Sequence, residues 1–465
     1  MPRMQAGAGT AQSAVTYANL WHEGRWLRNA TVQIDADGMV AAVATARTPA
    51  SKAIPGLTLP GLVDAHCHAF QRALGAWTQR AAGSHDDFWS WREAMYALAG
   101  RLDRDDLEAI TARCYLELLR GGYTAVAEFL YLHRLGDRRA LDADEAVAAA
   151  ARCTGMNLTL LPTLYQHSDF GGAPPRPGQL PFVRDTAQFL EDWRELGRRY
   201  PAGGPVALGV AFHSLRAVDI DTIARVHLAL QGDASCRCVH IHVAEQPAEV
   251  TGCQRQYGLP PVALLASRGL LSTKWALVHA THTSEAELTQ VRAAQATVVL
   301  CPTTEADLGD GCPLIAPFLE AGGQMAIGSD SNIGRNALDE LRQLEWSQRL
   351  ARGRRNVFSA AAEPAVADRL LRIAHAGGQR AIGTATGADF VTYNARVGDW
   401  ELQASSDYLG SLVFDSTAPR AHQVLVGGRW LIRDGTHPEE TEIEARYRET
   451  IGRLRRDIHG GQQHE

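Results

Sequence analysis

Short apolar runs recur through the middle of the chain, and stretches with the spacing of amphipathic helices separate them. Eight runs read as buried strands, at residues 57–63, 123–130, 158–164, 206–212, 239–243, 275–279, 297–301 and 325–329. The helical stretches include residues 104–119, 185–199, 220–230, 261–267 and 284–293. Strands that alternate with helices over about 270 residues predict an α/β fold, a (β/α)8 TIM-like barrel whose strands are buried on both faces.

The two ends of the chain read as short β-ribbons instead. Near the start, residues 21–27 and 31–34 are expected to form strands, and the Asp-Gly pair at 37–38 is typical of a hairpin turn. Near the end, residues 423–432 and the Asp-Gly pair at 434–435 repeat this pattern. Because chain termini often lie close together, we expect both ends to build one small β-sandwich.

The chain is therefore expected to form two domains. The composite β-sandwich takes residues 1–59 and 386–465, and the barrel takes residues 60–385. Apolar side chains recur at helical spacing over residues 439–458, which predicts a C-terminal helix docked on the rest of the protein.

Composition narrows the class of protein. The 465 residues are 45% hydrophobic and 21% charged, which is ordinary for a globular enzyme or binding protein. A net charge of −6 gives no reason to expect a nucleic-acid partner. No apolar run reaches the ~18 residues of a membrane span, and residues 1–15 lack the apolar core of a secretion signal. The eight cysteines are scattered without a CxxC pair, so we expect a protein of the reducing cytoplasm that does not bind a membrane.

Polar residues, many of them histidines, stand where the predicted strands end. In chain order they are His66 and His68, then Glu128, Tyr131 and His133, Tyr165 and His167, His213, His240, His242 and Glu245, His279 and His282, Thr303, Thr304 and Glu305, and Asp330. Barrel active sites are built at these strand ends, so the side chains are expected to converge. His66 and His68 share one face of a strand, so both can bind one metal ion. The pair alone fits a structural role equally well.

Seven segments in order resemble the formimidoylglutamate deiminases of the amidohydrolase superfamily. They are residues 66–72 (HCHAFQR), 91–96 (WREAMY), 127–131 (AEFLY), 211–218 (AFHSLRAV), 240–246 (HIHVAEQ), 277–282 (LVHATH) and 304–311 (TEADLGDG). The resemblance covers nearly the whole chain. It implies a distorted barrel with a β-sandwich built from both termini, in agreement with the strand pattern.

The resemblance also implies a metal site. The ligands of one Zn²⁺ per chain would be His66, His68, His242 and Asp330. Three neutral imidazoles and one carboxylate suit zinc and leave a position for water, and Fe²⁺ also accepts such a site. A second metal is not expected, since the strand at residues 206–212 carries no carboxylate.

The implied reaction is hydrolytic deimination of N-formimidoyl-L-glutamate to N-formyl-L-glutamate and ammonia, a step of histidine degradation. The metal would activate water, and His279, Glu245 and Asp330 would move protons.

The dicarboxylate substrate would be held by a second group of residues. Arg92 and Arg216 would hold its carboxylates, because Arg binds them in a bidentate manner. Gln71, Tyr131 and His213 would add hydrogen bonds. Without the resemblance, surface or ion-paired arginines would be the ordinary interpretation.

Two other functions remain open. An aminohydrolase acting on a guanine, cytosine or triazine ring would use the same metal, although paired arginines favour a small anionic substrate. A non-catalytic barrel used as a scaffold would be expected to have lost ligands, and here each proposed ligand is present. The resemblance further implies a homodimer.

Overall fold

The computed structural model describes residues 13–45, 52–80, 86–136, 141–201, 203–204, 206–394, 404–415 and 419–461. Its larger sheet has eight parallel strands whose spatial order follows the chain. They are β5 (Leu62–Cys67), β6 (Tyr123–Leu130), β7 (Asn157–Leu164), β8 (Val206–Phe212), β9 (Cys236–Val243), β10 (Trp275–His279), β11 (Thr297–Leu300) and β12 (Gln324–Ile327). The predicted eight-stranded barrel is therefore confirmed.

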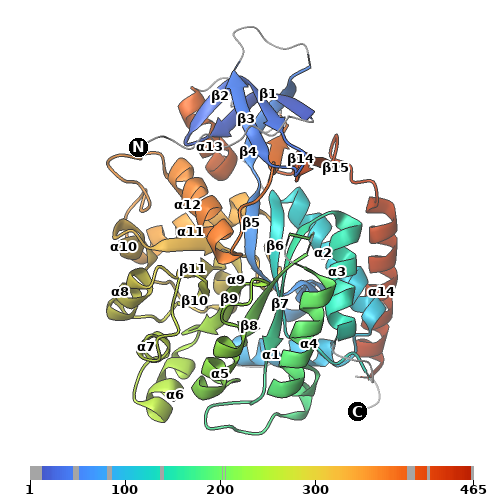
Figure 1. Cartoon of the computed structure of the whole chain (residues 1–465), viewed down its shortest axis with the longest axis vertical. Coiled ribbons are helices and arrows are strands. Elements are labelled where there is room, and N and C mark those ends of the chain that lie inside the picture. The colour runs from blue at the N-terminus through green and yellow to red at the C-terminus, as the bar shows by residue number, and fades with distance from the viewer. Residues whose placement is uncertain are drawn as a thin grey trace.

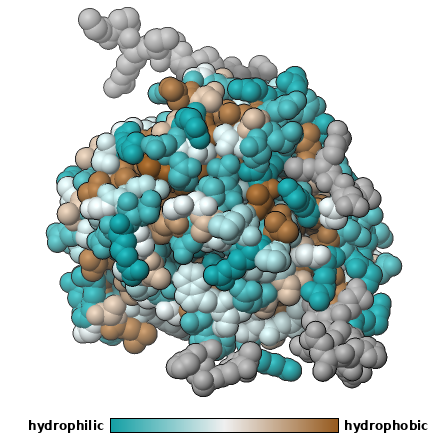
Figure 2. All heavy atoms as spheres, turned by 90° about the horizontal axis from the view of Figure 1, so that it is seen from below, coloured by the Kyte–Doolittle hydropathy of each residue, from teal (hydrophilic) through white to brown (hydrophobic). Residues whose placement is uncertain are grey.

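Helices surround this sheet (Figure 1). They are α1 (Phe88–Ala99), α2 (Arg104–Arg120), α3 (Leu141–Thr154), α4 (Thr186–Arg199), α5 (Ile220–Leu230), α6 (Pro247–Tyr257), α7 (Pro261–Ser267), α8 (Glu285–Ala293), α9 (Pro302–Leu308), α10 (Ile315–Glu320), α11 (Ala337–Arg352) and α12 (Val366–Ala381). No helix among the described residues is long and apolar enough to cross a membrane. Seen from below, hydrophobic and hydrophilic side chains are interspersed over the surface (Figure 2).

The barrel closes where β5 ends and the segment after β12 begins. The His68 N–H donates to the Asp330 carbonyl at 3.0 Å, and the Asp330 N–H donates to the His66 carbonyl at 2.8 Å. Beneath them, the buried Asp64 carboxylate accepts hydrogen bonds from the backbone N–H and hydroxyl of Ser329. Gly328 permits this approach, because a Cβ there would lie 2.7 Å from the His66 carbonyl oxygen. Closure thus places Asp330 beside the two histidines of β5.

Both ends of the chain contribute to a second, seven-stranded sheet, which lies above the barrel in Figure 1. Its strands are β1 (Ser13–His22), β2 (Arg25–Ile34), β3 (Val40–Thr45), β4 (Ile54–Pro60), β13 (Phe390–Tyr393), β14 (Ala421–Val426) and β15 (Arg429–Ile432). Two short helical pieces, α13 (Tyr408–Gly410) and a following π-turn (Ser411–Asp415), lie near it. The prediction that both termini build one small β-unit is confirmed.

Two strand predictions were wrong in detail. The run at 57–63 is two strands, since β4 belongs to the small sheet and the barrel strand β5 begins at Leu62. Both halves are buried, so the apolar pattern continues across the break. The stretch at 21–27 contains the turn at Glu23, whose φ is 49°, and Trp21 pairs with Trp26 across it. In so tight a hairpin, apolar and polar residues continue to alternate through the turn, so the sequence pattern does not reveal it.

The C-terminal helix α14 (Glu440–Gly461) docks on the barrel as predicted. Its apolar side chains Ile443, Ile451 and Leu454 are buried, and Arg113 of α2 forms a 2.6 Å ion pair with Glu444. Parts of the expected terminal domain, at 1–12, 46–51, 395–403, 416–418 and 462–465, lie outside the described residues. Division of the chain at 59/60 and 385/386 stays a proposal, consistent with strand ends at Pro60 and Phe390.

Candidate active site

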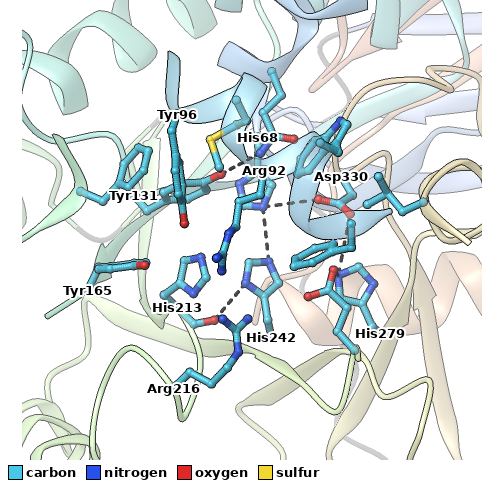
Figure 3. Close-up of a pocket in the computed structure, with 17 residues that line it drawn as sticks. His68, Arg92, Tyr96, Tyr131, Tyr165, His213, Arg216, His242, His279 and Asp330 are labelled. Carbon is cyan, nitrogen blue, oxygen red and sulfur yellow. Dashed lines mark hydrogen bonds and ion pairs between the residues drawn. The ribbon is translucent and has the colours of Figure 1, made fainter. Parts of the chain in front are cut away.

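Four side chains from three parts of the barrel meet at the C-terminal ends of its strands, and Figure 3 shows three of them, His68, His242 and Asp330. His66 lies on β5 next to its last residue, His68 directly follows the strand, His242 lies on β9, and Asp330 follows β12. The Nε2 atoms of His66 and His242 are 3.0 Å apart, and those of His68 and His242 are 3.3 Å apart. Asp330 Oδ1 lies 3.4 Å from Nε2 of both His66 and His68. The structure therefore brings together the four residues proposed as ligands.

This donor set fits a divalent metal ion. The Nδ1–H groups of His68 and His242 each donate at 2.9 Å to a backbone carbonyl, that of Phe129 and that of His213. In both rings Nε2 therefore keeps its lone pair for a metal. Burial lowers the pKa of His68 to about 3 and that of His242 well below its usual value, so both rings are neutral. Zinc at ~2.0–2.1 Å from tetrahedral ligands would separate their atoms by ~3.3–3.4 Å, close to the observed spacing.

Two further triads of possible ligand atoms lie nearby, and the first of them shares Asp330 with this cluster. His279 and Asp330 form one with Cys301, and His279 forms another with Glu245 and Asp310. Burial raises the pKa of the Cys301 thiol well above its usual value, which makes it a poor ligand. His279 thus lies beside the four-residue cluster and is available for proton transfer.

His279 lies among three carboxylates. Its Nε2 is 3.7 Å from Glu245 Oε1 and 3.7 Å from Asp330 Oδ2, and its Nδ1 is 3.4 Å from Glu305 Oε1. The His279 side chain is 1% exposed. Glu305 is held in place by a 2.9 Å hydrogen bond from the Cys301 N–H. Nδ1 of His279 thus faces the carboxylate of Glu305, and Nε2 faces those of Glu245 and Asp330. This arrangement suits proton transfer.

Electrostatics set the protonation of this group. Burial alone would lower the pKa of His279, but the negative charges of Glu245, Glu305 and Asp330 raise it to about 10. Burial raises the pKa of Glu245 to about 7, with His279 acting against this rise and Asp330 adding to it. A cation bound beside Asp330 would cancel part of the negative charge and lower the pKa of His279.

The backbone is strained at the same strand ends. Ala244, His279, Ala280 and Asp330 have φ values of 51°, 68°, 51° and 47°, in the left-handed region that non-glycine residues rarely adopt. Such conformations persist where the surroundings enforce them, and they gather at functional sites. Here they stand at or next to Glu245, His279 and Asp330, the residues proposed to move protons.

Two acidic residues near His279 were not assigned a role from the sequence. One of them is Glu305, on α9. The other, Asp310, lies in the loop after α9, where it accepts a hydrogen bond from the Gln246 side chain. Burial, and then the charge of Glu245, raise the pKa of Asp310 to about 8. Both residues fall within the 304–311 segment of the family resemblance, which was the available signal.

A pocket opens in front of the cluster (Figure 3). The pocket is narrow, with a cavity volume of about 40 Å³, and it is partly open to solvent. All five residues proposed to bind substrate line it: Gln71, Arg92, Tyr131, His213 and Arg216. The Gln71 amide donates to the Tyr131 hydroxyl at 2.7 Å, and Gln71 Oε1 has no partner in the described part of the chain. Tyr96 and Tyr165 also line the pocket, and sequence reasoning gave neither a role.

The two arginines of this pocket are buried cations without an acidic partner. Arg92 is 9% and Arg216 is 7% exposed, and Nε of each has no hydrogen-bond partner within the described ranges. Over the same residues, no ion pair joins either guanidinium to a carboxylate. The nearby Glu249 instead accepts backbone N–H groups of Ala244 and Glu245. Buried charges are normally paired, so these two point to an anionic ligand.

Other histidines at the strand ends bond to the backbone. His240 is 2.8 Å from the Ala381 carbonyl, and His133 is 2.6 Å from that of Thr163. His282 is 2.9 Å from the Asp310 carbonyl. These contacts tie neighbouring elements together at the rim and floor of the barrel.

Comparison with known proteins agrees with this geometry. The family model described as "Amidohydrolase family" matches residues 57–431. The chain is 38% identical over 444 residues to a formimidoylglutamate deiminase of Pseudomonas aeruginosa, covering 92% of this chain and 96% of that protein. It is 29% identical to an 8-oxoguanine deaminase of the same species, covering 82% and 83%.

A solved structure is also similar. The amidohydrolase from Brucella melitensis superposes with a TM-score of 0.88 and 35% identity, covering 95% of this chain and 100% of that one. The family match covers most of the chain, and the barrel, the terminal sheet and the histidine and aspartate cluster agree with it. The chain belongs to the amidohydrolase family.

Proposed function

We propose that this protein is a metal-dependent hydrolase that converts N-formimidoyl-L-glutamate to N-formyl-L-glutamate and ammonia. One observation carries the proposal: two unpaired buried arginines line the same pocket as residues of the metal-type cluster and its acidic neighbours. The substrate offers matching groups: two carboxylates and a cationic amidine, whose inner nitrogen is bonded to the carbon that bears one of the carboxylates. Identity to a formimidoylglutamate deiminase supports the same choice.

We further propose one Zn²⁺ per chain, bound by His66, His68, His242 and Asp330, with Fe²⁺ as the second choice. When bound, the metal supplies a Lewis acid and lowers the pKa of water, so that water can attack near neutral pH. The first three residues offer neutral imidazoles, and Asp330 offers the carboxylate that completes the set.

The chain's own residues handle the protons. Water adds to the formimidoyl carbon, a C–O bond forms, and the bond to the terminal nitrogen breaks, so that nitrogen must gain a proton to leave as ammonia. His279 faces Glu245 and Asp330, so it can take the proton from water and return one to the leaving nitrogen. Glu245, which lines the pocket, pairs with the amidinium cation.

The remaining pocket residues orient the substrate. Arg92 and Arg216 bind the carboxylates, and Gln71 with its free Oε1, Tyr131 and His213 supply hydrogen bonds. A cytoplasmic homodimer without membrane or nucleic-acid partners is part of the proposal, and the family resemblance supports it.

Ammonia release from N-formimidoyl-L-glutamate by the purified, metal-loaded protein tests the function. A matched panel of guanine, 8-oxoguanine, cytosine and an amino-triazine tests the ring alternative. Faster release from a ring substrate would replace the proposal with a ring aminohydrolase. Absence of both stoichiometric metal and turnover would favour the scaffold alternative.

An Arg216→Met variant should raise KM about 10- to 100-fold while kcat changes little. A hydrogen bond to a charged group contributes roughly 1.5–3 kcal/mol, and Arg216 makes such contacts before and during the reaction alike. Steady-state ammonia release checks this. Arg268→Met is the control, because Arg268 pairs with Asp221 on the outer surface. A fall in kcat at unchanged KM would assign Arg216 to the chemistry instead.

A further inference from the structure

Trp89 lies at the mouth of the barrel, next to two adjoining pockets. The inner pocket is the one in front of the metal-type cluster, and the outer one opens beside it and is lined by Trp89, Asp169 and Arg176, among others. Arg92 and Arg216 line both pockets, whereas Trp89 lines only the outer one. Arg92 and Arg216 therefore separate the two pockets, and Trp89 lies on their outer side.

The indole ring of Trp89 contacts both guanidinium groups. The Cζ atom of Arg92 lies 4.5 Å from the Trp89 ring centroid, and that of Arg216 lies 5.8 Å from it. Arg92 stands three residues after Trp89 on the same face of α1, whereas Arg216 comes from the loop after β8. One aromatic ring thus aligns cations from two separate elements.

An aromatic partner leaves the positive charge of an arginine available to a ligand, whereas an acidic partner neutralises it. A carboxylate would hold the arginines but neutralise them, whereas the ring face attracts a cation and carries no net charge. The two cations also repel each other, and after burial the charge of Arg216 is among the causes that lower the pKa of Arg92. Tyr96 also faces Arg92, at 5.4 Å, but among the described residues Trp89 is the ring that faces both guanidinium groups, so its removal is expected to let them separate.

The start of α1 holds Trp89 in place. The Asp87 carboxylate caps the helix by accepting the N–H groups of Trp89 at 2.9 Å and Ser90 at 3.1 Å. The Phe88 ring meets the indole edge-on at a centroid distance of 5.0 Å. The indole is therefore fixed by the helix cap and by packing, and it can support the arginines before a ligand arrives.

We propose that Trp89 is a positioning residue that keeps Arg92 and Arg216 side by side and un-neutralised for the two carboxylates of the substrate. The choice of a dicarboxylate rests on the proposed function. The stacked pair is pre-organised, so less freedom is lost when both carboxylates bind.

Three variants test this proposal: Trp89→Ala, Trp89→Phe and the control Trp346→Ala. Trp346 is a matched control, because it stacks on Arg342 at 5.7 Å on the outer face of α11, far from the pocket. Ammonia release gives KM and kcat, and calorimetry gives the Kd of glutarate, a plain dicarboxylate. Trp89→Ala should raise both KM and Kd about 5- to 30-fold with kcat nearly unchanged. Trp89→Phe should restore most of the affinity, and Trp346→Ala should match wild type.

The outcomes separate this inference from the proposed function. If wild type binds glutarate and Trp89→Ala weakens that binding, but no ammonia is released, the proposed function fails and the role of Trp89 stands. Unchanged KM and Kd in Trp89→Ala would overturn the role, as would a loss confined to kcat. Failure of wild type to bind glutarate would also overturn it. Circular dichroism of each variant checks the fold, and Trp89→Leu, which removes the aromatic face but keeps an apolar side chain, carries the test with the same expected rise in KM and Kd if Trp89→Ala unfolds.

Discussion

A His242→Ala variant should no longer hold stoichiometric metal, and its kcat/KM should fall by more than ~100-fold, since loss of an outer partner of a ligand alone costs 10–100-fold in metal affinity. His242 is central to the cluster, because its Nε2 lies 3.0 Å from that of His66 and 3.3 Å from that of His68. Removing it leaves two imidazoles and Asp330, too few to hold the ion tightly.

Elemental analysis of the purified variant, followed by ammonia release with added Zn²⁺, measures both effects. His227→Ala is the control, because His227 is a half-buried histidine of α5 that packs against Trp275, outside the cluster. The control should keep wild-type metal content. A His242→Ala protein that retains one equivalent of metal and full activity would refute the proposed ligand set.

The barrel could be predicted because its strands are buried on both faces. Every residue of β5 and β6 is buried, so each strand appears in the sequence as a mainly apolar run, interrupted by Asp64 and His66 in β5 and by Thr124 and Glu128 in β6. The same property concealed the break between β4 and β5, since burial continues from one sheet into the other. Periodicity reports burial and does not report which sheet a residue joins.

The meeting of His66, His68, His242 and Asp330 could be expected for a similar reason. Parallel barrel strands all end at one rim, so polar residues at their ends must converge there. The roles of Glu305, Asp310 and Trp89 could not be read in this way. They lie on α9, in a loop and on α1, whose placement over the rim depends on caps and packing that no short pattern records.

The positive φ angles could not be predicted from the sequence either. His279 and Asp330 are not glycines, so nothing in their residue type announces a left-handed backbone. In the structure His279 ends β10 and Asp330 follows β12 in this conformation, and both side chains face the same centre. Because His279 faces this centre, we expect its removal to lower turnover more specifically than the removal of other residues of the site.

A His279→Asn variant should keep its metal and its substrate affinity but lose about 10²- to 10⁴-fold in kcat, the usual contribution of a general acid–base group. Asparagine is similar in size and polar, yet it cannot take a proton from water and return it to the leaving nitrogen. Glu245 and Asp330, each 3.7 Å from His279 Nε2, would remain in place, so the pocket would still bind the amidine.

Metal content and KM measured beside kcat distinguish this role from ligation. His279 and Asp330 also form a potential ligand triad with Cys301, so a variant that loses its metal would make His279 a ligand instead of a proton carrier. His282→Asn is the control, because His282 stands three residues later and the described hydrogen bond of its side chain is with the Asp310 carbonyl. Full turnover by His279→Asn would transfer the proton step to Glu245 and Asp330, the two carboxylates that face the same nitrogen.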